Sequence, residues 1–173
     1  MGDSLITVIA IFLAAILMFI FPLMSVSERN DDIAQLSVET ATNEFVDNVS
    51  TTGKMTYENY NRFTQTLAAT GNYYDVELEI KRLDENPSKK SAWGSSDRIG
   101  ENLYYSEYTT QIIDQLDNKG YIDLKQGDMV SVQVKNKNRT IAQMLRSFFY
   151  SISGSDAYQI AASHSRVVTA NAH

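Results

Sequence analysis

The sequence predicts an α+β protein in which one long N-terminal helix, transmembrane and then amphipathic, packs on a small, mainly antiparallel sheet with additional helices. Three observations lead to this fold class. Leu5 to Met24 is a run of 20 residues without a charge, an apolar stripe with helical spacing follows it, and later segments alternate apolar and polar residues. The 173 residues have room for this run and one domain. We therefore divide the chain into a hydrophobic N-terminal helix, 1–26, and an α+β head, 27–173, which begins with an amphipathic helix, 27–52.

The run from Leu5 to Met24 is long enough to cross a membrane, because a helix of this length spans about 30 Å. It could serve as a cleaved export signal, a permanent membrane anchor or the packing core of a filament. Export signals begin with basic residues and have an apolar stretch of about 7–15 residues. Here no Lys or Arg precedes a longer run, but Ser25-Val26-Ser27 fits a cleavage site, so all three roles stay open. Pro22 either ends the helix at the membrane interface or bends it there.

Helical periodicity resumes after the hydrophobic run. The apolar stripe consists of Ala34, Val38, Ala41, Phe45 and Val49. We expect Glu39, Thr42, Asp47 and Asn48 to lie mostly away from this stripe, and Gly53 to end the helix. Residues 5–50 then form one helix of about 70 Å, apolar all round in its first half and amphipathic in its second.

The rest of the head is predicted to alternate helices and strands. Thr56 caps a helix that Gly71 closes, with Tyr60, Phe63 and Leu67 on its inner face. YYDVELEIKRL is a half-buried strand, because Tyr74, Val76, Leu78 and Ile80 alternate with polar residues.

The second half of the head repeats this alternation. Residues 84–100 read as a loop. A helix from 103 to 116 has Tyr105, Thr109, Ile112 and Leu116 on one side, and Gly120 ends it. GDMVSVQVKNKN is a strand with Val130, Val132 and Val134 inward. RTIAQMLRSFFY is a helix whose core stripe is Ile141, Met144, Leu145 and Phe148, and a last strand covers 158–169. Helices cannot hide both faces of so few alternating strands, which favours an antiparallel sheet.

Composition excludes several function classes. The net charge is −6 and the basic residues form only short clusters, so we expect no nucleic-acid partner. The chain has no cysteine, which excludes disulfides and thiol catalysis. The residue pattern shows no phosphate-binding loop, metal site or cofactor site. We therefore expect a protein that is not an enzyme.

A long helix that is apolar and then amphipathic, leading into a small α/β head, resembles the type IV pilin superfamily. The resemblance is closest to pilins and pseudopilins of tight-adherence (Tad) systems. It is carried by LITVIAIFLAAILMFIFPLM, by Pro22 late in that run, and by the continuation AQLSVETATNEFV. It covers about the first 50 residues, and for the head it is a likeness of architecture only.

The resemblance implies a structural subunit of a cell-surface filament or secretion apparatus. Such a subunit sits in the membrane before assembly and then packs with copies of itself or with other pilin-like subunits. The residues assigned to assembly or membrane contact are Asp3, Leu5, Ile9, Phe12, Ile16, Ile20 and Pro22. Pilin precursors have a basic leader that ends in Gly and a Glu within the apolar helix. Here Gly2 is the candidate processing site, the leader has no base, and Asp3 is the nearby acid.

Two alternatives remain. The chain could be a single-pass envelope protein whose head binds a partner or ligand through the 84–100 loop, with Trp93 as the contact. It could also be an anchored envelope enzyme with a pocket around His164 or Asp97. In each case we expect the head outside the cytoplasm, because a short uncharged N-terminus is easily left behind and the head is acidic.

Overall fold

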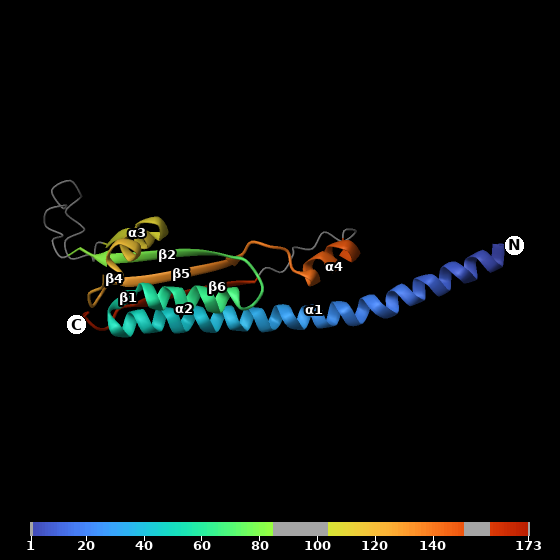
Figure 1. Cartoon of the computed structure of the whole chain (residues 1–173), viewed down its shortest axis with the longest axis horizontal. Helices are drawn as coiled ribbons and strands as arrows, with labels where there is room; N and C mark the ends of the chain where they lie inside the picture. The colour runs from blue at the N-terminus through green and yellow to red at the C-terminus, as the bar shows by residue number, and fades with distance from the viewer. Residues whose placement is uncertain (1, 85–103, 151–159, 173) are drawn as a thin grey trace, which may run out of the picture.

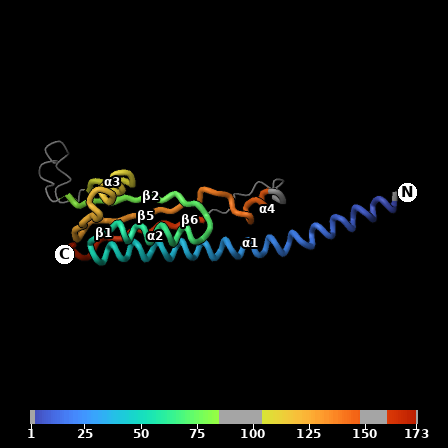
Figure 2. Tube along the Cα trace, in the orientation of Figure 1, coloured from blue at the N-terminus to red at the C-terminus, as the bar shows by residue number. Residues whose placement is uncertain are grey.

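The computed structural model describes residues 2–84, 104–150 and 160–172. Helix α1 (Gly2–Thr52) is continuous over 51 residues and forms the long axis of the molecule (Figure 1). Its second half packs in the head, while its first half extends away from it (Figure 2). Gly53 ends α1 with a φ of +66°, a left-handed conformation that glycine adopts without steric cost. The predictions of one helix from 5 to 50 and of its end at Gly53 are confirmed.

The described part of the head contains a four-stranded antiparallel sheet in the order β3-β2-β5-β6. Its strands are β2 (Tyr74–Leu83), β3 (Tyr104–Tyr108), β5 (Met129–Asn136) and β6 (Ala161–Val167). A separate antiparallel ribbon pairs β1 (Lys54–Thr56) with β4 (Tyr121–Asp123). The further helices are α2 (Tyr57–Ala68), α3 (Thr109–Lys119) and α4 (Ile141–Tyr150). The predicted fold class, α+β with a long N-terminal helix on small antiparallel sheets, is confirmed.

One hydrophobic core joins the second half of α1 to α2, α3 and the sheet. All five residues of the predicted α1 stripe, Ala34, Val38, Ala41, Phe45 and Val49, are buried in it. The rings of Phe45 and Phe63 stack across the α1–α2 contact, with centroids 4.7 Å apart. The sheet contributes Leu78, Ile80, Val130, Val132 and Val134, as the alternation predicted.

The predicted N-cap of α2 and the glycine that ends α3 are present, whereas α2 ends at Ala68, before the predicted Gly71. The Thr56 hydroxyl accepts a hydrogen bond of 3.1 Å from the backbone N–H of Asn59, which caps α2. Gly120 closes α3 with a φ of +79°, and its N–H donates to the carbonyl of Leu116. These caps satisfy backbone groups that a helix end would otherwise leave without a partner.

The predicted helix from 103 to 116 is wrong in its first part. Tyr104–Tyr108 is strand β3, paired with β2 so that Arg82 lies opposite Tyr105, and α3 begins only at Thr109. Helical spacing happens to extend back to Tyr105, but YYSEY is rich in residues that favour strands. The free edge of β2 supplies the partner that decides the conformation. Ribbon strands β1 and β4 were not predicted, because three residues cannot show a period.

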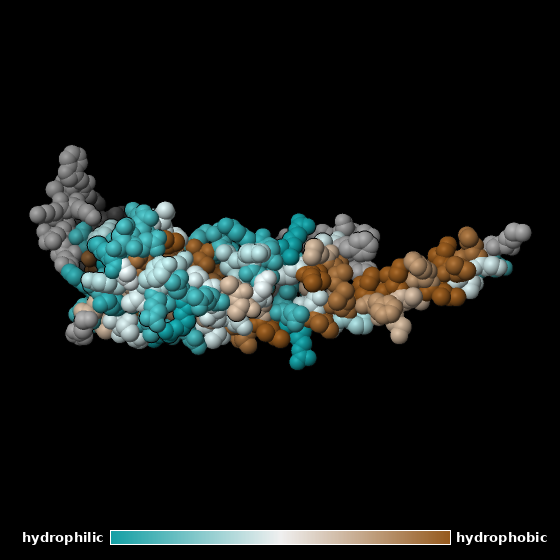
Figure 3. Space-filling view, in the orientation of Figure 1, coloured by the Kyte–Doolittle hydropathy of each residue, from teal (hydrophilic) through white to brown (hydrophobic). Residues whose placement is uncertain are grey.

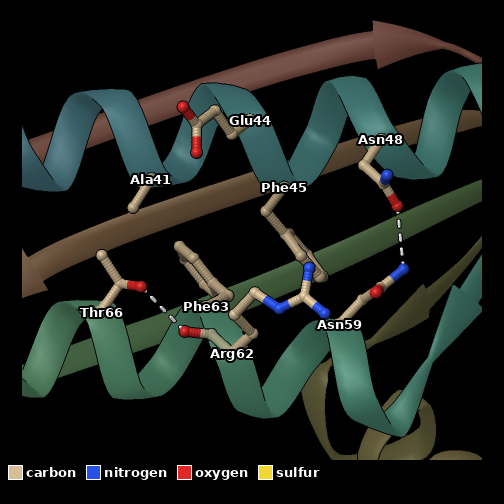
Figure 4. Close-up of a pocket in the computed structure, with 8 residues that line it drawn as sticks. All are labelled: Ala41, Glu44, Phe45, Asn48, Asn59, Arg62, Phe63 and Thr66. Carbon is tan, nitrogen blue, oxygen red and sulfur yellow. Dashed lines mark hydrogen bonds between the residues drawn. The ribbon is translucent and has the colours of Figure 1, made fainter.

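Two predicted faces are also wrong. Thr42 is fully buried, because α1 packs against both the sheet and the neighbouring α2 (Figure 4) and so buries a sector wider than one stripe. Its hydroxyl donates to the Val38 carbonyl. In α4, Ile141 and Met144 are exposed while Ala142 is buried, so the predicted core stripe of this helix is not its packed side. The Phe148 side chain lies outside the described part. The last strand, predicted as 158–169, covers 161–167 in the described part of the chain.

Pro22 does not end the helix, so the interpretation as a helix break is wrong. α1 continues through it, and the N-terminal part of the helix is inclined to the rest (Figure 1). Proline has no N–H to donate to the preceding turn, and the missing hydrogen bond is a known cause of helix bending.

Candidate membrane and assembly surface

The first half of α1, residues 2–26, is an apolar rod that the described part of the head leaves largely uncovered. Phe12 is 69% exposed and Phe19 is 77% exposed. Other exposed apolar side chains of this half are Leu5, Ile6, Val8, Ile9, Ile11, Leu13, Ile16, Met18, Phe21, Leu23 and Val26. Figure 3 shows this rod as the hydrophobic end of the molecule. α1 is long and apolar enough to span a membrane, a property that signal sequences share, and its most apolar window has no buried residue.

The residues predicted for assembly all lie on this rod. Leu5, Ile9, Phe12 and Ile16 are exposed, and Ile20 is half-buried. Gly2 is the first residue of α1, and Pro22 is exposed on the helix surface.

Asp3 lies in the first turn of α1, where a negative charge interacts favourably with the helix dipole. Its backbone carbonyl accepts a hydrogen bond of 2.8 Å from the Thr7 hydroxyl. Asp3 thus lies at the free end of the rod, exposed and far along α1 from the head.

The junction between rod and head is held by α4. The Thr140 hydroxyl donates a hydrogen bond of 2.6 Å to the carboxylate of Asp31, and both residues are buried. Arg146 donates twice to one carboxylate oxygen of Glu28, at 2.9 and 2.8 Å. Ser27, the residue before Glu28 on α1, is also buried. These contacts fix α4 against α1 directly after the apolar segment.

The sequence contains one signal for this junction that the predictions did not include. Thr140 and Gln143 form a capping box: each side chain bonds the other's backbone N–H, at 3.2 Å in both directions. A Thr followed three residues later by Gln, just before an apolar run, marks such a helix start. The contacts of Thr140 and Arg146 to α1 have no sequence signal, because they join residues 109 and 118 positions apart.

A shallow groove of about 190 Å³ runs between α1 and α2 (Figure 4). The stacked rings of Phe45 and Phe63 lie in its wall, and a hydrogen bond of 2.8 Å from Asn59 to Asn48 crosses one end. Glu44 and Arg62 supply one charge of each sign at the rim. The groove offers a small polar-rimmed contact surface rather than a converging set of reactive groups.

His164 takes part in a charged cluster between β6 and α1. Its Nε2 lies 3.4 Å from a carboxylate oxygen of Asp47, and Arg166 donates to the same oxygen. The hydrogen bond from Arg166 is the largest effect on Asp47 and lowers its pKa. Desolvation, the next largest effect, raises the pKa, and the charge of Arg166 and the contact with His164 add smaller effects that lower it. Ser163 and Ser165 alternate to the other face of the strand, so their neighbourhood to His164 in sequence does not become a nucleophile–base contact.

The remaining predicted site residues are not among those that the structure describes. Trp93 and Asp97, with the rest of the predicted loop after Asp84, fall outside the described residues. Within the described ranges no group of three or more His, Asp or Glu side chains is placed to hold a metal ion.

No family model, curated protein or solved structure matches this chain. The class of protein is therefore defined by fold and surface alone. It is an α+β head carried on the second half of a long N-terminal helix, the first half of which is an apolar rod able to span a membrane.

Proposed function

We propose that this chain is a pilin-like structural subunit or pseudopilin of a cell-surface filament or secretion apparatus. In this proposal the rod sits in the membrane before assembly and packs among the rods of other subunits afterwards. The head stays outside the cytoplasm in both states.

The observation that carries the proposal is the uncovered apolar half of α1. Apolar side chains gain free energy when they leave water, about 25 cal/mol for each Å² buried. The head offers this half of the helix no cover, so lipid or other apolar helices must provide it. A bundle of rods is one such environment, and it lets a subunit leave the membrane without exposing the rod to water.

The placement of the head also fits a filament subunit. The head is fastened to the second half of the same helix, through the core around Val38 and Phe45 and through the contacts of α4. Residues 3–16 of the rod are exposed on all sides of the helix in the described structure, so neighbours can pack there and heads would lie at the periphery of a bundle.

The test is to shear cells that produce the chain, pellet the supernatant at high speed and image the pellet by electron microscopy with a probe for the head. We expect filaments that contain the chain. Phe12→Asp should abolish them, because an Asp at a helix centre costs about 3 kcal/mol in an apolar environment. Tyr73→Asp, an exposed head position, is the matched control and should leave filaments intact.

A chain that stays wholly in the membrane pellet, with no filaments, would overturn the proposal in favour of the single-pass envelope protein. Mass spectrometry of the mature N-terminus adds a second criterion. A start at Asp3 supports processing of the pilin kind, whereas a start at Glu28 supports a cleaved export signal and removes the rod from the mature protein.

A further inference from the structure

Helix α4 is amphipathic, but its apolar side is not the side that packs on α1. Ala142 is 2% exposed, and Arg146 reaches Glu28 on α1. Ile141 and Met144 are 56% and 50% exposed. At about 100° per residue, the Ile141–Met144 side points about 150° away from the Ala142–Arg146 side. The apolar side of α4 is thus left uncovered by the helix to which α4 is attached.

The contacts of α4 also give its direction. Its start is tied to Asp31 through Thr140, and its next turns are tied to Glu28 through Arg146. Moving along α4 therefore means moving back along α1, toward the apolar rod. The helix continues from Arg146 to Tyr150, beside the end of the rod (Figure 1). In Figure 3 the hydrophobic surface of the rod continues to the place where α4 lies.

We propose that α4 is a second membrane contact, which runs from the head toward the interface of the bilayer and turns Ile141 and Met144 toward the lipid. The inference rests on the membrane-inserted state of the proposed function. If the rod crosses the bilayer from Leu5 to Met24, the contacts at Glu28 and Asp31 hold α4 at the level of the headgroups. Short amphipathic helices bind there by placing one apolar face at the boundary of the acyl chains.

Two features indicate that a lipid bilayer covers the apolar side of α4: its continuity with the rod and the balance of charges beside it. The rod and the apolar side of α4 form neighbouring surfaces at one level, so one bilayer can cover both. Charges of both signs lie beside α4: Glu28, Asp31 and Asp32 of α1 line one site with Arg146, and Arg139 precedes the helix, so basic residues are not in excess. The contact is therefore apolar and should not require anionic lipid. In this arrangement the capped start of α4 and the Glu28–Arg146 pair set the tilt of the head on the membrane.

The chain has no cysteine, so single cysteines can report depth without interference. The full chain is reconstituted in phosphatidylcholine vesicles with a nitroxide label at Ile141→Cys, Met144→Cys, Ser147→Cys, Phe12→Cys or Tyr73→Cys. Electron paramagnetic resonance then compares collisions with oxygen, which enriches in lipid, and with a polar nickel complex, which stays in water. Circular dichroism verifies that each variant is folded.

We expect labels at 141 and 144 to collide several-fold less with nickel than the label at 147, and the label at 12 to lie deepest. Adding anionic lipid should change these values little. The proposal is overturned if labels at 141 and 144 are as accessible to nickel as those at 147 and 73 while the label at 12 is in lipid. It is also overturned if 141 and 144 are shielded from both reagents and show spin–spin broadening at high protein density, since a second copy then covers α4.

If the label at 12 is accessible to nickel, the rod is not inserted in the membrane, and the proposed membrane contact of α4 fails with it. The presence or absence of filaments in electron micrographs does not change what the label at 12 shows about the membrane. The two proposals therefore fail in distinguishable ways.

Discussion

The hydroxyl of Thr140 donates a hydrogen bond to the carboxylate of Asp31 at 2.6 Å, and both side chains are buried although 109 positions separate them in the chain. The same hydroxyl accepts from the N–H of Gln143 and so caps α4. One side chain thus starts α4 and fixes its place on α1. The position of α4 relative to the rod depends on this pair and on Glu28–Arg146.

Thr140→Val should loosen α4. The substitution keeps the shape of the side chain but leaves a buried carboxylate without its donor, a loss of about 1.5–3 kcal/mol. We expect faster hydrogen exchange of the backbone amides in 141–147 and a lower free energy of unfolding, measured in micelles. Thr140→Ser keeps the hydroxyl and serves as the control. Wild-type exchange rates in the Val variant would show that the pair does not hold α4.

Gly53→Ala should destabilise the head more than Gly120→Ala. Both glycines have a positive φ, +66° and +79°, which costs an L-residue about 1–2 kcal/mol. At Gly53 the added Cβ would also meet the backbone oxygen of Ala170 at 2.5 Å, whereas at Gly120 it meets no atom within 4 Å. Denaturant unfolding of both variants checks the difference, and equal losses would mean that the C-terminal segment yields without cost.

Phe63→Ala should lower the free energy of unfolding by about 3–5 kcal/mol, the range for removing a buried ring. Phe63 is 4% exposed and stacks on Phe45, so its loss opens a cavity between α1 and α2. Phe63→Leu fills most of that space and should cost clearly less. Equilibrium unfolding of the two variants tests this, and equal stability of the Ala variant and the wild type would contradict the α1–α2 core.

Asp47 should contribute stability that disappears in acid. The hydrogen bond from Arg166 lowers its pKa in the folded state below the ordinary value of 3.8. A lowered carboxyl pKa stabilises the folded state above the unfolded pKa, and this contribution is lost as the pH falls through the folded pKa. The melting temperature of wild type should therefore exceed that of Asp47→Asn at pH 6, and the two should converge below about pH 3.8.

This effect of Asp47 should be small, because Asp47 and Arg166 are both partly exposed. High salt at pH 6 should reduce the difference further by screening the charges. A difference that persists unchanged at low pH would mean that the Asn substitution acts through packing instead of charge.

Much of the fold could be predicted because its signals are local and periodic. The stripe from Ala34 to Val49 and the alternation in β2 and β5 each record which side of an element meets a core. Thr56, Gly53 and Gly120 mark helix ends by their own conformational preferences. The apolar rod was predicted from the uncharged run alone, since the residues assigned to it need no partner to be recognised.

The errors occur where a partner far away in the sequence decides. Tyr105 belongs to a helical stripe in the sequence, but the edge of β2 draws it into a strand. Thr42 looks like a residue of the polar face, but α2 and the sheet enclose that side of α1. In α4 the sequence does show an apolar stripe, but the prediction that this stripe packs in the core is wrong, because Ile141 and Met144 are exposed.

The sequence by itself therefore determined a long helix with an apolar and an amphipathic half, and a head built on antiparallel strands. Hydrophobic periodicity and helix-end signals extend over only one or two turns, so each segment of the sequence contains its own signals in full. Only the tertiary structure decided that α4 sits at the junction, held by Thr140 and Arg146, with Ile141 and Met144 uncovered. A helix shows in its own sequence which side is apolar, but what lies against that side depends on contacts with residues that the chain brings close only when it folds.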